Sequence, residues 1–125
     1  MSLRVLIVDD SPAMRAFVRK SLQNCGLPIE SIEDAADGVE GLAKVREGRV
    51  NLILSDVNMP NMDGEEFVKT LKSDKDLRDI PVIMVTTDNS TQRVLRLRQL
   101  GAHGYLCKPF TTDLMKQKLL SVLGS

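Results

Sequence analysis

The stretch VNLILSDVNMPNMDG, residues 50–64, starts as an apolar run and then reaches an acid. Its first five residues, 50–54, are almost entirely apolar, which predicts a strand buried on both faces. Ser55 and Asp56 follow directly, and the chain then enters a segment rich in Asn, Pro, Asp and Gly, typical of a loop. Because a buried strand holds the residue at its end rigidly, Asp56 is a candidate functional residue.

Similar apolar runs recur on both sides of this stretch, with turn residues between them. Most are continuous rather than alternating, which indicates a parallel sheet covered by helices on both faces. The run at residues 29–35 is the weakest of them. The predicted strands are residues 3–8, 29–35, 50–54, 81–86 and 104–107.

Helical patterns lie between and after these strands, and each begins with a capping residue. Gly26, Gly48 and Gly101 are expected to end the first, second and fourth helices. Strict alternation of strand and helix predicts a three-layer α/β fold, a doubly wound (βα)5 parallel sheet with right-handed crossovers. The expected helix starts are Ser11 with Pro12, Asp37 with Gly38, Asp63 with Gly64, Ser90, and Thr111 with Thr112.

Size and composition limit the possible functions. The chain has 125 residues, which favours one domain spanning residues 1–125. Seventeen basic and seventeen acidic residues balance, so charge gives no argument for direct binding to nucleic acid or to an anionic membrane. No apolar run approaches the ~20 residues of a membrane span, and no signal peptide is recognisable. We expect a cytoplasmic protein in which Cys25 and Cys107 stay reduced.

The ends of the predicted strands carry the residues with chemical potential. Asp9 and Asp10 follow the first strand, Asp56 the third, Thr86 ends the fourth and Lys108 follows the fifth. Ligands of open parallel sheets bind beyond the carboxyl ends of the strands, so these side chains should meet at one edge. Three adjacent carboxylates repel one another, and at least one pKa should rise unless a cation is present. Oxygen ligands of this kind suit Mg²⁺.

A lysine and a threonine beside such a cluster indicate an anionic substrate. Lys108 would supply a fixed positive charge, and Thr86 a hydrogen bond. Metal, ammonium and hydroxyl groups together suit a phosphoryl group. A carboxylate of the cluster could then act as the nucleophile, because carboxylates form aspartyl phosphates.

The segments VLIVDDS, LILSDVNMPNMDG, VIMVTT and GYLCKPF, in this order and spacing, resemble the receiver domain of two-component response regulators. The resemblance covers essentially the whole chain and is strongest to the single-domain chemotaxis type. It implies a flavodoxin-like sheet with strand order 2-1-3-4-5. It also implies a switch that catalyses only its own phosphorylation and dephosphorylation, rather than an enzyme acting on an external substrate.

The resemblance assigns roles to the residues at the sheet edge. It makes Asp56 the phosphoacceptor, which takes its phosphoryl group from a sensor histidine kinase. Mg²⁺ would be held by Asp9, Asp10, Asp56 and the backbone carbonyl of Asn58. Lys108 would bind the phosphoryl oxygens.

Further roles follow from the same resemblance. Thr86 would also bind the phosphoryl group, and its movement would let Tyr105 swing inward. Asn58 and Asp88 would tune the rate of dephosphorylation, and Pro109 is expected to follow a cis peptide bond. The face made by the fourth helix, fifth strand and fifth helix would then change its affinity for a protein partner, such as the flagellar motor switch.

Several alternatives stay open from the sequence. The chain could be a receiver domain taken from a longer regulator, such as a transcription factor, or a Mg²⁺-dependent phosphohydrolase with an aspartyl nucleophile. Arg93, Arg96 and Arg98 could form a docking surface for an acidic partner or a merely solvated helix face. Asp63 is expected to be a helix cap rather than a metal ligand, and His103 a loop residue.

Overall fold

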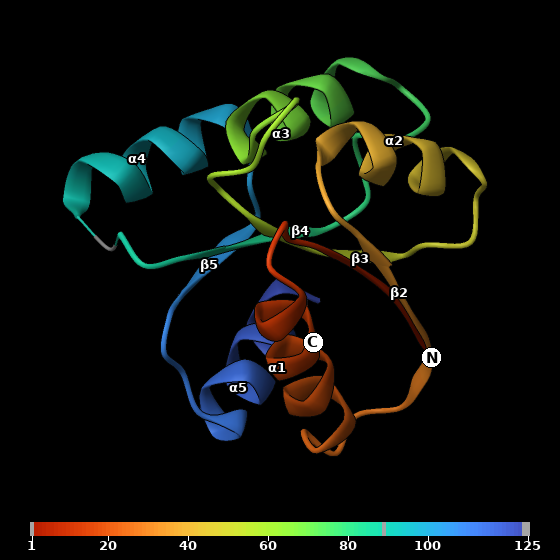
Figure 1. Ribbon diagram of the computed structural model, residues 1–125, viewed down its shortest axis with the longest axis vertical. Helices are drawn as coiled ribbons and strands as arrows, with labels where there is room; N and C mark the ends of the chain where they lie inside the picture. Colours follow the sequence, from red (N-terminus) through yellow and green to blue (C-terminus); the bar gives the residue numbers. More distant parts are fainter. Residues whose placement is uncertain (1, 89, 124–125) are drawn as a thin grey trace.

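A computed structural model describes residues 2–88 and 90–123. Strands and helices alternate along these residues without exception (Figure 1). The elements are β1 (Leu3–Val8), α1 (Pro12–Gln23), β2 (Ile29–Ala35), α2 (Gly38–Arg46), β3 (Leu52–Asp56), α3 (Gly64–Ser73), β4 (Val82–Thr86), α4 (Thr91–Leu100), β5 (Gly104–Cys107) and α5 (Thr112–Val122).

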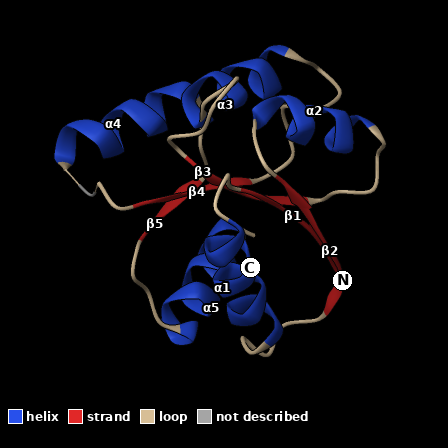
Figure 2. Ribbon diagram, viewed as in Figure 1, coloured by secondary structure: helices blue, strands red, loops and turns tan. Residues whose placement is uncertain are grey.

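The strands form one parallel sheet in the order β2-β1-β3-β4-β5, which confirms the expected fold. Helices α1 and α5 cover one face of the sheet, and α2, α3 and α4 cover the other (Figure 2). Alternate residues of a strand therefore serve two apolar cores. Leu6 and Val8 pack with Phe67 in the core under α2, α3 and α4, whereas Val5 and Ile7 pack in the core under α1 and α5.

Strand β3 lies two residues further along the chain than predicted. Val50 is buried, as its apolar side chain suggested, but it precedes the strand. The Asn51 side chain accepts the Arg4 amide at 2.7 Å, so a side chain takes a position that a ladder hydrogen bond would fill. As a consequence, Asp56 is the last residue of the strand itself and not a residue after it.

The helix starts agree with the sequence prediction. In each helix the capping side chain accepts an amide of the first turn, which satisfies a donor that the helix leaves unpaired. Gly101 ends α4 with φ 107°, a left-handed conformation that favours glycine. The caps are Ser11, Asp37, Asp63, Ser90 and Thr111.

Two further expectations concern the whole chain. Cys25 and Cys107 are both free thiols, as expected. Among the described residues, no helix has the length and apolar character needed to cross a membrane.

Candidate functional site

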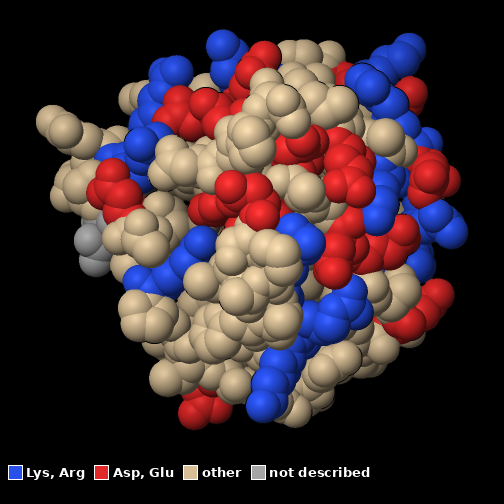
Figure 3. All heavy atoms as spheres, viewed as in Figure 1, with Lys and Arg blue, Asp and Glu red and all other residues tan. Residues whose placement is uncertain are grey.

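Four strands end at the same edge of the sheet, here called the carboxyl edge. The register places Val8 level with Ser55, and Asp56 level with Val85. Thr86 is level with Cys107. The acids that follow β1, the acid that ends β3, the hydroxyl that ends β4 and the lysine after β5 are thus delivered to this edge. Both acidic and basic groups lie on the face shown in Figure 3, and several acidic groups gather near its middle.

Three carboxylates meet at the carboxyl edge. Asp9, Asp10 and Asp56 each present an oxygen within 4.8 Å of the others. Asp9 is buried, with 3% of its surface exposed, while Asp10 is exposed. An all-oxygen donor set that includes a solvent-facing member fits Mg²⁺, which keeps several waters when bound to proteins.

Lys108 supplies the positive charge that faces these acids. Its Nζ lies 3.4 Å from Asp56 Oδ1 and 3.4 Å from Asp9 Oδ2. Only 11% of the Lys108 side chain is exposed. Because the three groups are shielded from water, their interaction is stronger than that of a surface ion pair.

Burial raises the pKa of Asp56 above its usual value. The Lys108 ammonium group opposes this effect, and the neighbouring Asp9 carboxylate adds to it. Repulsion between carboxylates, which the sequence predicted, is thus a smaller cause of this raised pKa than burial. A cation bound here would relieve the repulsion that helps to raise it.

Backbone contacts fix the buried Asp9 and the partly buried Asp56. Asp9 Oδ1 accepts the Ser11 amide at 2.8 Å, and Asp56 Oδ1 accepts the Val57 amide at 2.9 Å. Arg15 Nη1 donates to the carbonyl of Asp9 at 2.6 Å. Sequence reasoning missed Arg15, because an arginine in the first turns of a helix gives no sign of which carbonyl it reaches.

Gly64 is a second residue that shapes the backbone of the site. Its amide donates to the Val57 carbonyl at 2.7 Å, which brings the start of α3 against the end of β3. A Cβ atom at this position would lie 2.2 Å from the backbone oxygen of Asp56. Gly64 was expected at a helix start, and the structure adds that a residue with a Cβ atom does not fit beside the Asp56 backbone.

Thr86 ends β4 as a buried hydroxyl, with 3% of its surface exposed. Its Oγ1 accepts the Asp88 amide at 3.0 Å, so this oxygen shapes the loop that follows the strand. Asp88 Oδ1 in turn accepts the Ser90 amide at 3.0 Å, and this bond is the largest cause of the lowered pKa of Asp88. The hydrogen of the Thr86 hydroxyl remains available to an anion.

Residues 5–120 match the family described as Response regulator receiver domain. This chain belongs to that family. The receiver is 36% identical over 124 residues to chemotaxis protein CheY1 of Helicobacter pylori, covering 98% of each chain. It is 33% identical over 118 residues to chemotaxis protein CheY-3 of Vibrio cholerae, covering 94% of this chain and 89% of the relative.

Solved structures agree with this assignment. The chemotaxis response regulator CheY4 of Vibrio cholerae superimposes with a TM-score of 0.86 at 39% identity, over 98% of this receiver and 99% of that chain. CheY in the CheX-CheY-BeF3-Mg²⁺ complex of Borrelia burgdorferi gives a TM-score of 0.86 at 26% identity, over 98% and 90% of the two chains. The receiver is therefore a CheY-like signalling domain of two-component systems, which sets the phosphohydrolase alternative aside.

Of the remaining candidate residues, Asn58, Asp63 and Pro109 follow strand ends at this edge, whereas His103 precedes β5 at the opposite edge of the sheet. Asn58 is exposed in the loop after β3, and its roles stay predictions. The Lys108–Pro109 peptide bond is cis, as expected. His103 lies in a loop, also as expected, but its Nδ1 accepts the Val82 amide at 3.1 Å, a contact that the sequence did not indicate. Asp63 is the cap of α3, its carboxylate accepting the Glu66 amide at 2.9 Å.

Proposed function

We propose that this receiver is a phosphorylation-controlled switch in which Asp56 accepts a phosphoryl group from a sensor histidine kinase. The observation that carries the proposal is the placement of the Lys108 ammonium group 3.4 Å from both Asp9 and Asp56, beside the exposed Asp10. A paired nucleophile, a fixed cation and an oxygen-ligand cluster are the parts that phosphoryl transfer needs.

The transfer follows from these positions. An Asp56 oxygen attacks the phosphorus, a new P–O bond forms, and the P–N bond to the donor histidine breaks. The departing imidazole takes its proton from solvent. Lys108 gives up its present contact with the Asp56 carboxylate and binds the phosphoryl oxygens instead. The Thr86 hydroxyl donates a hydrogen bond to the same group, which requires it to move toward Asp56.

Mg²⁺ would be held by Asp9, Asp10, Asp56 and the backbone carbonyl of Asn58, and it would neutralise charge on the phosphoryl oxygens. The donor set described above supports this ligand assignment. The relative from Borrelia burgdorferi, whose complex contains BeF3 and Mg²⁺, supports it further.

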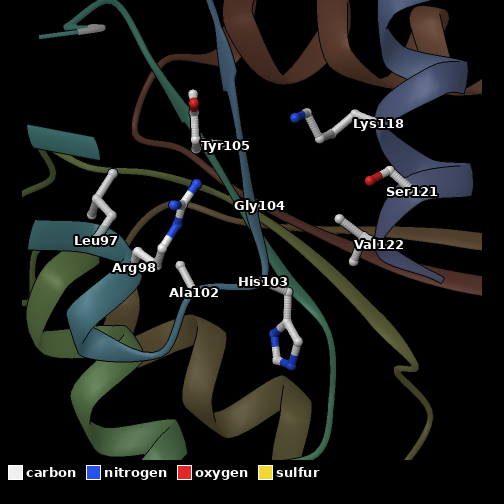
Figure 4. A pocket seen from close by; sticks show the side chains of 9 residues that line it. All are labelled: Leu97, Arg98, Ala102, His103, Gly104, Tyr105, Lys118, Ser121 and Val122. Atoms are coloured by element: carbon white, nitrogen blue, oxygen red, sulfur yellow. The ribbon is translucent and has the colours of Figure 1, made fainter. Parts of the chain in front are cut away.

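The output would be read on the face formed by α4, β5 and α5. A pocket of about 190 Å³ lies there between the end of α4 and α5, and Arg98, Tyr105 and Lys118 line it (Figure 4). Lys118 Nζ lies 5.0 Å from the centre of the Tyr105 ring. Two cations in a pocket that an aromatic ring also lines favour a partner with acidic side chains.

Tyr105 would respond to phosphorylation through Thr86. When the hydroxyl moves toward the phosphoryl group, it frees space beside β5, and Tyr105 shifts inward from the pocket. Phosphorylation would thus change the populations of two conformations rather than create a new fold. The relatives named as chemotaxis proteins support a partner such as the flagellar motor switch, with the exchange taking place in the cytoplasm.

Intact-protein mass spectrometry after incubation with acetyl phosphate tests this function. We expect one phosphoryl adduct that requires Mg²⁺ and is absent from Asp56→Asn. Asp63→Asn is the matched control, because this acid lies in the same loop but serves as the α3 cap. An adduct that persists in Asp56→Asn, or none in the wild-type protein under any condition, contradicts the proposal.

A further inference from the structure

An ion cluster joins the rim of the proposed phosphorylation site to α3 and α4. We call Glu65, Asp88, Arg93 and Arg96 the rim cluster. Arg93 lies between two acids: Nη1 pairs with Glu65 Oε2, and Nε lies 3.5 Å from Asp88 Oδ2. Arg96 Nε pairs with the second oxygen of Glu65 at 3.2 Å. Arg93 and Arg96 therefore face α3, and of the three arginines considered as a docking surface only Arg98 lines the pocket beside Tyr105.

The part of the rim cluster next to α3 is the less exposed part and has the more ion pairs. Arg93 and Glu65 expose 28% and 23% of their side chains, whereas Asp88 exposes 49%. Both Glu65 oxygens are occupied by guanidinium groups, one from each arginine. Partly buried pairs are screened less by salt than exposed ones, so Glu65 fixes Arg93, and Arg93 then offers a fixed charge to the more exposed Asp88.

Asp88 stands at the rim of the site. It lies two residues beyond Thr86, in the loop that follows the strand whose Val85 is level with Asp56. One oxygen of its carboxylate accepts the Ser90 amide, and the other faces Arg93. Both oxygens are thus engaged at the start of α4, although a hollow of about 220 Å³ beside Asp88 and Arg93 leaves space for the carboxylate to move.

We propose that Arg93, fixed by Glu65, is a positioning residue that holds the Asp88 carboxylate at α4 and so slows hydrolysis of the phosphorylated Asp56. The inference rests on the proposed function. In that hydrolysis a water oxygen attacks the phosphorus, the bond from phosphorus to the Asp56 oxygen breaks, and inorganic phosphate leaves. A released Asp88 would orient this water and accept its proton, which then passes to solvent.

The test is the lifetime of the aspartyl phosphate. Protein is phosphorylated with acetyl phosphate and Mg²⁺, the donor is removed, and loss of the adduct is followed by intact mass. We expect Arg93→Gln to hydrolyse about fivefold faster than wild type, since a released carboxylate supplies part of a general base's effect. In an Asp88→Ala background the same substitution should change the rate by less than about twofold.

Two further variants separate positioning from loosening of the fold. Glu65→Gln should accelerate hydrolysis in the same direction as Arg93→Gln but by less, because Arg93 keeps its own contact with Asp88. Arg96→Gln is the matched control: it also removes a partner of Glu65, but no contact joins Arg96 to Asp88, so its rate should stay near wild type. The rate of adduct formation should be unchanged in all three variants.

Several results would overturn the inference. The inference is wrong if the adduct of Arg93→Gln hydrolyses at the wild-type rate or more slowly. It is also wrong if Arg93→Gln accelerates hydrolysis equally in the wild-type and Asp88→Ala backgrounds. In either case a wild-type adduct on Asp56 leaves the proposed function standing. Absence of any adduct in the wild-type protein would instead reject both, and it is visible before any rim-cluster variant is made.

Discussion

The ammonium group of Lys108 lies 3.4 Å from a carboxylate oxygen of Asp56, although 52 positions separate the two residues in the chain. Asp9 lies at the same distance from the ammonium group. One positive charge therefore offsets two negative charges, one buried and one partly buried, when no metal is bound. We therefore expect the charge balance of the whole cluster, rather than any single pair, to affect both the stability of the receiver and the reactivity of Asp56.

Lys108→Met should lower the rate of phosphorylation by acetyl phosphate about 10²–10³-fold, because a preorganised charge on the phosphoryl oxygens is lost. The same variant should unfold at a lower temperature in EDTA, since the buried Asp9 and the partly buried Asp56 carboxylates lose their counter-charge. Mg²⁺ should stabilise the variant more than wild type. Initial rates of adduct formation and thermal unfolding with and without Mg²⁺ check these points.

Lys116→Met is the control for Lys108, because Lys116 is exposed on α5 and pairs with no acid of the cluster. It should leave both the phosphorylation rate and the response to Mg²⁺ unchanged. If Lys108→Met binds Mg²⁺ no more favourably than Lys116→Met, the charge balance described here is wrong.

Asp56→Asn should stabilise the metal-free protein at neutral pH by about 1 kcal/mol, because functional sites often retain unfavourable charges. The folded state raises the pKa of Asp56 above 3.8, so folding favours the protonated carboxyl. The stability that this group contributes is present below 3.8 and is lost as the pH rises through the raised pKa. The advantage of Asn should therefore shrink as the pH falls.

Urea unfolding of wild type and Asp56→Asn in EDTA, from neutral pH down to 3.8, measures the difference between their unfolding free energies. Adding Mg²⁺ should reverse the order, since the wild-type cluster offers one more anionic ligand than the variant. A difference in unfolding free energy that does not change with pH would show that burial and repulsion at Asp56 are not its cause.

The fold was predictable because its signals are local. A cap such as Ser11 and a stop such as Gly101 act within one helical turn, and a continuous apolar run needs no knowledge of its neighbours. The start of β3 was misplaced because it depends on a contact between Asn51 and Arg4, which lie 47 positions apart. Sequence periodicity carries no information about a contact of that kind.

The site was predictable to the extent that strand ends determine it. Parallel strands have their carboxyl ends at one edge of the sheet, and this rule predicted that Asp56 and Lys108 lie close together. The contacts of Arg15 with the Asp9 carbonyl and of Arg93 with Glu65 were not predicted, since they depend on side-chain rotamers and on how helices pack. Such contacts become visible only in three dimensions.

Gly64→Ala should destabilise the receiver by about 3 kcal/mol, at the upper end of the usual cost of overpacking. The added Cβ would lie 2.2 Å from the Asp56 carbonyl oxygen and 2.8 Å from the Val57 Cα. Both are backbone atoms, so the loop holding the phosphoacceptor must shift. Chemical denaturation measures the cost, and a reduced rate of adduct formation should accompany it.

Gly48→Ala is the matched substitution for Gly64. Gly48 has φ 82° but no atom within 4 Å of an added Cβ, so only backbone strain of about 1 kcal/mol is expected. Phosphorylation of this variant should be normal. If Gly64→Ala and Gly48→Ala lose equal stability, the close approach of α3 to Asp56 contributes nothing to the cost of Gly64→Ala.

His103 should make the receiver less stable in mild acid. Its Nδ1 must be unprotonated to accept the Val82 amide at 3.1 Å. Burial of part of the ring, and then the neighbouring Lys72 ammonium group, lower the pKa of His103 below 6.5. The unfolded chain therefore takes up the proton first, and the stability present above 6.5 is lost as the pH falls toward the lowered pKa.

The variant His103→Asn tests this, because the Asn side-chain oxygen can accept the same amide without titrating. The unfolding free energy of wild type minus that of the variant should fall as the pH is lowered from about 7.5 to about 5.5. Measuring the difference between the two proteins cancels the opposite contribution of Asp56. A Lys72→Met background should narrow the affected pH range, since the repulsion that helps to lower the pKa of His103 is then absent.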